Sequence, residues 1–171
     1  KLRTVESSVT ISAPLDENGI ISAAILEGAL LDAGIPYQRR LRDNPVASKG
    51  PSICLNSNVS SQLQPVESNP LCIHICPVEV DALLASDGSA RKGVLSTVAI
   101  CAALAQSISP SGAMSRMLMP WALSGNWLSD AMEHTYDPVF TVMRDYLSNE
   151  GFIRVVPMPE VPEVNPESIP G

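Results

Sequence analysis

Apolar and polar positions alternate in blocks at the start of the chain. Val9 to Ala13 is a short run of small and apolar residues that predicts a buried strand. Ile20 to Leu31 is apolar around most of a helical circumference, and only Ser22 and Glu27 interrupt it. A helix of this kind is buried on more than one side. Leu15 to Gly19 is a polar turn between the two segments, so the chain opens with a strand, a turn and a buried helix.

The predicted helix has signals at both ends. Asp16 or Asn18 offers a short side-chain oxygen that can accept from the free N–H groups at its start. Gly34 and Pro36 end it, because glycine adopts the left-handed conformation after a helix and proline cannot continue one. Strand, turn and helix together open a doubly wound α/β unit, in which ligands bind at the carboxyl ends of the strands. We therefore expect functional residues in the turn that follows Ala13.

Further short apolar runs, separated by turn residues, predict more strands. These runs are Ile35 to Leu41, Ser52 to Asn56, Leu71 to Cys76 and Gly151 to Val156. Val78 to Leu84 fits either a helical turn or a strand, and Ser60 to Pro70 is polar and rich in turn residues.

Three longer segments have helical patterns. They are Lys92 to Ser107, Ala113 to Ser124, and Asn126 to Ser148 with a new helix starting at Pro138, and we expect Trp121 and Trp127 in the core. Alternating strands and helices indicate one α/β domain over residues 1–156, with a mostly parallel sheet covered by helices on both faces. Pro157 to Gly171 contains five prolines and is predicted to be a linker or tail.

Composition and charge narrow the class of protein. Apolar residues make up 45% of the 171 positions, which is enough for a core. The formal net charge of −7 comes from 11 basic and 18 acidic residues, and phosphate binding needs clustered Lys and Arg, so nucleic acid should bind weakly at most. The dense basic segment Tyr37 to Arg42 fits a solvated edge strand. No apolar run approaches the ~18 residues of a membrane span, so we expect no membrane partner.

The cysteines raise the question of a metal site. They are Cys54, Cys72, Cys76 and Cys101, and three of them lie in apolar segments, which predicts reduced thiols in an intracellular protein. Cys72, His74 and Cys76 alternate and therefore share one face of a strand, and Cys54 lies on a neighbouring predicted strand. These residue types can bind tetrahedral zinc. Because zinc ligands usually lie on turns, we favour core thiols and a locally bonded His74.

The first turn and helix resemble the first motif of the DHH phosphoesterase superfamily, to which the RecJ exonucleases belong. The family pattern is His-x-Asp-x-Asp-Gly followed by a small, apolar helix. Here Pro14 stands at the His position, Asp16 at the first Asp and Asn18 at the second, before Gly19 and the segment IISAAIL. The resemblance implies a DHH-like fold.

The same resemblance implies where further metal ligands would lie. SICLN resembles a strand that leads to a lone Asp, and Asn56 replaces that Asp. LCIHICP resembles the strand that leads into the Asp-His-His triplet, with His74, Ile75 and Cys76 in its place. WALSGNWLSDAM resembles a later segment, in which Asp130 keeps the carboxylate. The family uses two divalent ions, which need several anionic ligands. We therefore predict no catalytic residue, no bound metal and no cofactor, and regard five positions as vestigial: Asp16, Asn18, Asn56, His74 and Asp130. His134 is expected to be a surface or capping histidine.

A family scaffold without its ligands implies binding in place of catalysis. The resemblance points to the inactive, archaeal-type RecJ-like proteins that associate with GINS and the MCM helicase during DNA replication, in the cytoplasm at the nucleoid. One alternative is a divergent Mn²⁺-dependent phosphoesterase or single-strand exonuclease that uses Asp16, Asp130 and a further carboxylate such as Asp81 or Asp87. Another is a domain that binds a nucleotide without cleaving it.

Overall fold

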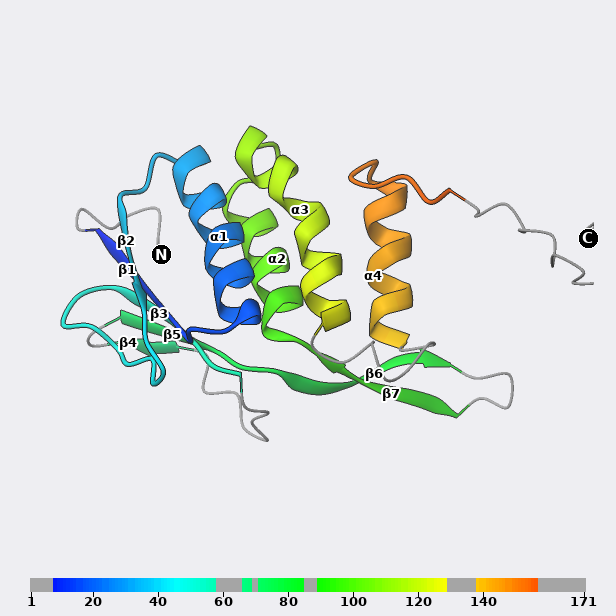
Figure 1. Cartoon of the computed structure of the whole chain (residues 1–171), viewed down its shortest axis with the longest axis horizontal. Coiled ribbons are helices and arrows are strands. Elements are labelled where there is room, and N and C mark those ends of the chain that lie inside the picture. The colour runs from blue at the N-terminus through cyan, green and yellow to red at the C-terminus, as the bar shows by residue number, and fades with distance from the viewer. Residues whose placement is uncertain (1–7, 58–65, 69–70, 85–88, 129–137, 157–171) are drawn as a thin grey trace, which may run out of the picture.

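A layer of helices lies on one side of a twisted sheet (Figure 1). The computed structural model describes residues 8–57, 66–68, 71–84, 89–128 and 138–156. The strands are β1 (Val9–Ala13), β2 (Tyr37–Leu41), β3 (Ser52–Leu55), β4 (Val66–Ser68), β5 (Leu71–Ile75), β6 (Val78–Leu84) and β7 (Ala90–Leu95). The helices are α1 (Glu17–Asp32), α2 (Thr97–Ile108), α3 (Ala113–Asn126) and α4 (Pro138–Asn149).

The main sheet has five strands in the order β2-β1-β3-β5-β4. Strands β2, β1, β3 and β5 are parallel, and β4 pairs antiparallel to β5 at one edge. Strands β6 and β7 form a separate antiparallel hairpin beneath α4 (Figure 1). The α/β class and the mostly parallel sheet predicted from the sequence are confirmed, and β2 is the edge strand that its arginines predicted.

Helix α1 has the end signals that its sequence predicted, although it begins at Glu17, three residues before the predicted start at Ile20. Of the two predicted caps, Asp16 is the one that acts, and its carboxylate accepts from the Gly19 N–H at 2.7 Å. At the other end Gly34 has a φ of 67°, and its N–H donates to the Leu31 carbonyl. The following Ile35 N–H donates to the Leu30 carbonyl, which completes a Schellman motif.

The hydrophobic core lies between the sheet and the helices. Alternate strand residues such as Ile11, Ile53 and Leu55 face this core and are fully buried. Helices α1, α2 and α3 pack against one another above them (Figure 1). In the part of the chain that the structure describes, all the helices lie on this one side, so the expectation of helices on both faces is wrong. The loop from β2 to β3 approaches the other face, where the Val46 N–H donates to the buried Ser12 hydroxyl at 3.3 Å.

An acidic side chain joins the end of α1 to the start of α3. Gly112 precedes α3 and offers no capping side chain. The carboxylate of Asp32 supplies the acceptors, because it accepts from the Met114 N–H at 3.2 Å and the Ser115 N–H at 2.8 Å. A negative charge is unfavourable at the C-terminus of α1 but favourable at the N-terminus of α3. Asp32 therefore fixes how the two helices sit against each other.

Several predicted elements need correction. The segment Lys92 to Ser107 is not one helix, because its first residues belong to β7 and Ser96 caps α2. Residues 151–156 form no strand, since the chain turns back there and the Phe152 N–H donates to the Leu147 carbonyl at 2.8 Å. The segment Val78 to Leu84, left open between two structures, is the strand β6. The three residues of β4 lie inside a stretch predicted as polar turn.

The two tryptophans are not in the core. Trp121 is 59% exposed and Trp127 is 38% exposed, with an edge-on contact to the Phe140 ring. The prediction that both residues are core residues is therefore wrong. The core instead consists mostly of aliphatic side chains, as the sequence of α1 indicates.

Candidate functional site

The carboxyl ends of β1 and β3 meet at one edge of the sheet, as parallel neighbours do. Asp16 follows β1, and Ser57 follows β3. The Ser57 hydroxyl donates to Asp16 Oδ2 at 2.8 Å, while Asp16 Oδ1 accepts from the N–H of Gly19. Gly19 packs directly on the carbonyl of Pro14, so a side chain at this position would collide with it. The strand-end carboxylate is therefore part of the hydrogen-bonding that shapes the turn.

Asn56 lies at the same edge and connects three elements through its backbone. Its N–H donates to the Ile75 carbonyl of β5 at 2.8 Å, and its carbonyl accepts from the Thr97 hydroxyl of α2 at 2.7 Å. Next to Thr97, the buried Ser96 hydroxyl donates to Asn126 Oδ1 of α3 at 2.8 Å. The strand-end region is thus held by neutral amides and hydroxyls together with the carboxylate of Asp16.

The structure brings together only some of the predicted vestigial positions. Asn18 lies in the first turn of α1, close in sequence to Asp16. His74 lies within β5 and belongs to a different cluster, described below. Asp81 is on β6, in the other sheet, and lines an apolar cavity of about 590 Å³ between α2, α4 and the hairpin. Three residues lie outside the described part of the chain: Asp87, Asp130 and His134.

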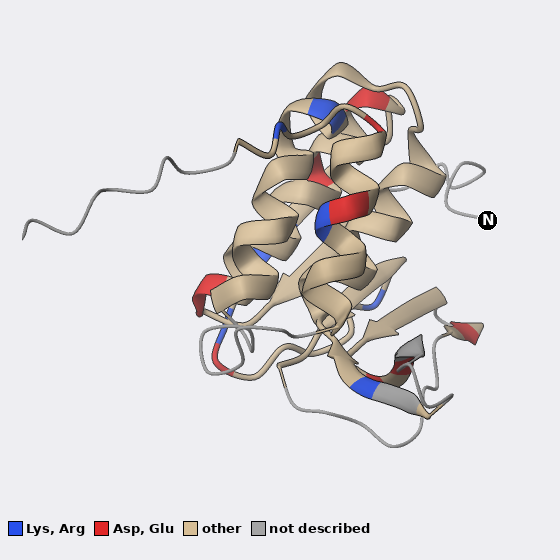
Figure 2. Cartoon of the chain, turned by 90° about the vertical axis from the view of Figure 1, so that its right-hand side faces the viewer, with Lys and Arg blue, Asp and Glu red and all other residues tan. Residues whose placement is uncertain are grey.

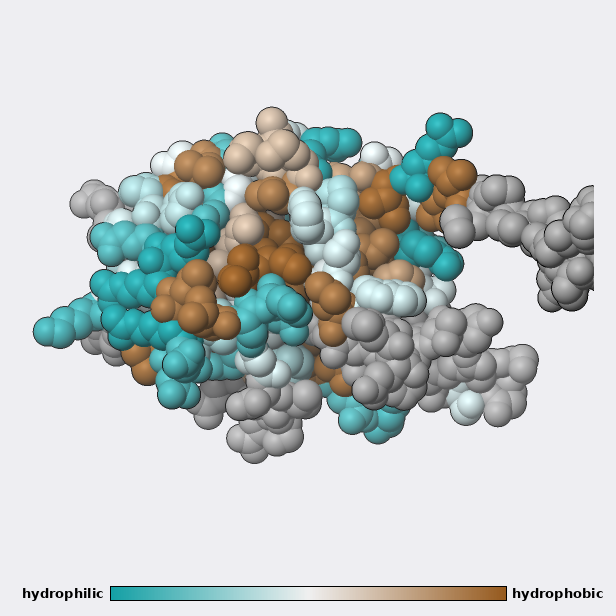
Figure 3. Space-filling view, viewed as in Figure 1, coloured by the Kyte–Doolittle hydropathy of each residue, from teal (hydrophilic) through white to brown (hydrophobic). Residues whose placement is uncertain are grey.

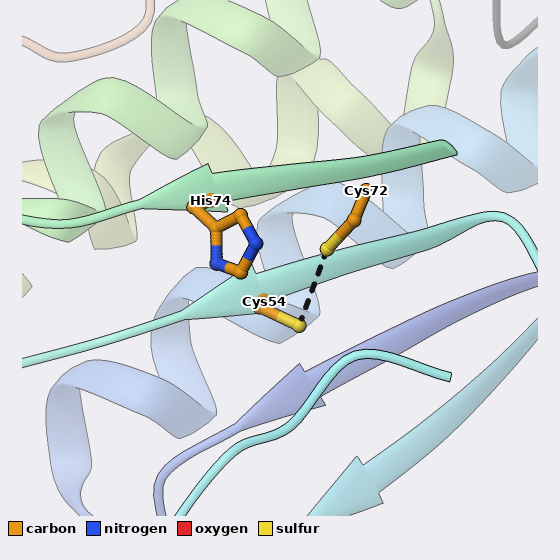
Figure 4. A group of neighbouring side chains, drawn as sticks. All are labelled: Cys54, Cys72 and His74. Carbon is orange, nitrogen blue, oxygen red and sulfur yellow. Dashed lines mark hydrogen bonds between the residues drawn. The ribbon is translucent and has the colours of Figure 1, made fainter. Parts of the chain in front are cut away.

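A second cluster lies on the sheet face opposite the helices (Figure 4). Cys54 on β3 and Cys72 and His74 on β5 place their sulfur and nitrogen atoms within 4.8 Å of one another. The register aligns Cys54 with His74, and both sulfurs are buried. The Cys72 thiol donates to Cys54 Sγ at 3.6 Å. Cys76, which sequence alternation grouped with these residues, follows the end of β5 and is not part of the cluster.

Glu67 borders this cluster, and the sequence analysis missed it. It lies directly opposite Cys72 in the antiparallel register of β4 and β5. Its carboxylate Oε1 is 3.5 Å from His74 Nε2. The only sequence signal was the short alternation Val-Glu-Ser, which polar neighbours obscured.

The environment of the cluster keeps a thiol protonated. Burial, and to a smaller extent the neighbouring Cys72 thiol and Glu67 carboxylate, together raise the pKa of the Cys54 thiol to about 12. Ser52 opposes this rise. The Cys54 sulfur is therefore neutral unless a cation displaces its proton.

Helix α3 carries exposed apolar side chains along its outer side. These residues, which we call the α3 stripe, are Met114, Met117, Trp121 and Leu128, and the last lies just beyond the helix end. Ser115, Met119 and Ala122 face the opposite way and are buried. Figure 3 shows that apolar residues also reach the surface elsewhere on the helical side of the molecule. The spacing of three, four and seven residues matches one face of a helix that packs against another helix.

Charged residues in the described part of the chain form no large basic patch. Figure 2 shows that Lys and Arg lie scattered among acidic and uncharged residues on the face in view. In the basic strand β2, Arg39 faces α1 and pairs with Glu27 at 3.4 Å. Burial raises the pKa of Glu27, and the Arg39 guanidinium partly reverses that rise. Arg39 is thus paired with a carboxylate of α1 while its side chain stays 48% exposed.

The fold is that of an α/β protein with a mostly parallel five-stranded sheet. None of its described helices combines the length and the apolar character needed to cross a membrane. Comparison with known protein families, with curated proteins and with solved structures finds no match.

Proposed function

We propose that this chain is a non-catalytic, RecJ/DHH-like protein that binds other proteins, and that its partners belong to the GINS and MCM helicase assembly of DNA replication. The observation that carries the binding role is the α3 stripe, an exposed apolar helix face with helix-packing spacing. The named partners rest on the sequence resemblance alone. The acidic net charge of −7 favours protein over nucleic acid as the ligand.

The strand-end edge supports the absence of catalysis in this proposal. A two-metal phosphoesterase needs several anionic ligands at that edge. The carboxylate of Asp16 accepts hydrogen bonds from Gly19 and Ser57, and in the sequence Asn56 stands where the family has a carboxylate. These residues form a polar turn and do not provide the charge that two dications require.

The α3 stripe suits a helix of a partner protein. Methionine and tryptophan are enriched at protein interfaces, and a large aromatic residue near the centre often carries much of the binding free energy. Trp121 lies in the middle of the stripe and is 59% exposed in the free chain. Partner binding would bury this ring without changing the core beneath it.

Calorimetric titration of the purified chain with recombinant GINS and, separately, with MCM tests the proposal. We expect at least one of them to bind with a micromolar or lower Kd. Trp121→Ala should weaken that binding by about 30-fold, as truncation of a central aromatic anchor does. Val46→Ala is the matched control, because Val46 is an exposed apolar residue on the loop between β2 and β3, and should leave the Kd unchanged.

Two results would contradict the proposal. One is the lack of heat with both partners. The other is micromolar Mn²⁺ binding that disappears in Asp16→Asn, together with cleavage of short oligonucleotides. Asn keeps the helix cap but removes the charge, so this variant separates metal binding from folding.

A further inference from the structure

Cys54, Cys72 and His74, which we call the thiol–imidazole cluster, have the geometry of a metal site. Neither the fold nor the proposed function requires such a site. Three ligand atoms of two types converge from the adjacent strands β3 and β5 (Figure 4). Two thiols and an imidazole are a donor set that selects zinc over the harder cations Mg²⁺ and Mn²⁺. The cluster lies on the sheet face away from the helices, and Asp16 is not one of its members.

The distance between the sulfurs fits two ligands of one ion. Cys54 Sγ and Cys72 Sγ are 3.6 Å apart. A disulfide would need about 2.05 Å. Two thiolates bound to tetrahedral zinc at about 2.3 Å each lie about 3.8 Å apart. The side chains therefore need almost no rearrangement to hold an ion between them.

The imidazole supplies an independent observation. The His74 side chain is 33% exposed, but its Nε2 atom is buried and makes no hydrogen bond in the described part of the chain, since Glu67 Oε1 at 3.5 Å does not meet hydrogen-bond geometry. A buried polar atom without a partner costs free energy that a ligand would recover. Figure 4 shows the imidazole ring of His74 beside the two sulfurs, with a ring nitrogen directed toward them.

Glu67 lies outside the group of atoms within 4.8 Å of one another, but it is the fourth ligand that the site can recruit. Its Oε1 is 3.5 Å from His74 Nε2, and zinc-bound nitrogen and oxygen at about 2.1 Å each lie about 3.4 Å apart. Glu67 lies on the exposed edge strand β4, so its side chain can turn toward the sulfurs.

We propose that Cys54, Cys72, His74 and Glu67 bind one Zn²⁺ ion in a structural, four-coordinate site. Each thiol loses its proton to solvent as its sulfur binds, the imidazole binds as the neutral form through Nε2, and no electron is transferred. Four protein ligands leave no open position for a substrate. The ion joins the central strands β3 and β5 to the short edge strand β4, which has only three residues to hold it in the sheet.

Metal titration of the full chain after removal of metal with a chelator tests this site. We expect one equivalent of Zn²⁺ to bind and to raise the melting temperature. Co²⁺ should give the visible absorption of a tetrahedral ion and a thiolate charge-transfer band. Cys54→Ser should abolish that band, while Cys101→Ala should retain it, because Cys101 is a buried cysteine on α2 outside the cluster.

The edge strand provides a variant that does not depend on the core. Glu67→Gln should weaken zinc binding by at least about tenfold, as loss of one ligand does. Glu79→Gln is its control, since Glu79 is an exposed glutamate that pairs with Lys92 on the hairpin. The proposal is overturned if the chain binds no stoichiometric zinc, if Cys54→Ser and Glu67→Gln bind it as wild type does, or if mild oxidation converts Cys54 and Cys72 to a disulfide in the presence of zinc.

Discussion

At the scale of single residues, Asp16 has a structural role that its sequence context partly predicted. Its place before an apolar helix indicated a cap, and the hydrogen bond to Gly19 confirms that. The contact with Ser57 was not predictable, because it depends on β1 and β3 being neighbours and on the chain turning at the same edge. Long-range contacts of this kind have no local sequence signal.

Asp16→Ala should lower the free energy of unfolding by about 1 kcal/mol, with a range of about 0.5–2 kcal/mol, because α1 loses its N-cap. Urea denaturation followed by far-UV circular dichroism measures this change. Asp16→Asn should retain most of the stability, since an amide oxygen caps nearly as well. Equal losses in both variants would mean that the negative charge, and not the cap, is what stabilises the turn.

At the scale of elements, the alternation of residue types within β1 and β3 bears on which sheet faces the helices cover. The core-facing positions of β1 and β3 are aliphatic, as in Ile11 and Ile53. The alternate positions carry hydroxyls and thiols, as in Ser12, Ser52 and Cys54. Strands that are covered by helices on both faces of the sheet are apolar on both faces. The alternation therefore indicated a second sheet face without helices. The serines and cysteine on that face are small, however, and small residues also fit a strand that is buried on both faces.

Helix α2 shows where local patterning fails. Residues 93–95 share their small or apolar character with the helix that follows, so no composition change separates the end of β7 from α2. The boundary is set by pairing with β6 and by Ser96, which caps the helix through the Ala99 N–H. Both are contacts of the folded chain, and Ser96 alone resembles any other polar interruption in an apolar run.

Helix α2 also leads to a prediction about alkaline pH. Burial raises the pKa of the Cys101 thiol from 9.0 to about 12, with the nearby Ser22 hydroxyl opposing the rise. Above about pH 9 the unfolded thiol loses its proton while the native thiol keeps it, so the native state becomes less stable as the pH rises. The contribution is fully present below about pH 9 and falls by about 1.4 kcal/mol per pH unit above it.

Urea denaturation at several pH values between about 8 and 11 measures this dependence. Cys101→Ala should show a shallower loss of stability with pH than the wild type, even if it is less stable at neutral pH. All other titratable groups are the same in both proteins, so their contributions cancel in the comparison. Parallel slopes would show that the thiol of Cys101 ionises equally in the native and unfolded states.

At the scale of the whole molecule, the five-stranded sheet and the β6–β7 hairpin differ in how much of the structure packs against them. The five-stranded sheet with α1, α2 and α3 encloses most of the core. The β6–β7 hairpin is a two-stranded sheet that packs mainly on α4. Two-stranded sheets are marginal without such support. The chain should therefore open in stages.

Native-state hydrogen exchange tests this expectation. Amides of β1, β3 and the centre of α1 should exchange only through global unfolding, and amides of β6 and β7 should exchange through openings of lower free energy. Mass spectrometry of peptides from both regions separates the two classes. A single exchange free energy for all these strands would mean that the hairpin and the main sheet unfold as one unit.

The two edges of the five-stranded sheet bear on self-association. An unpaired edge strand offers its N–H and C=O groups to strands of other molecules, and charged side chains or a short length prevent this. β2 exposes Gln38, Arg39 and Arg40, and β4 is only three residues long. Like-charged arginines repel when two β2 edges approach, and β4 offers too few hydrogen bonds to seed a ladder. Charge repulsion at the edge strand β2 and the short length of the edge strand β4 thus protect the sheet against growing into fibrils.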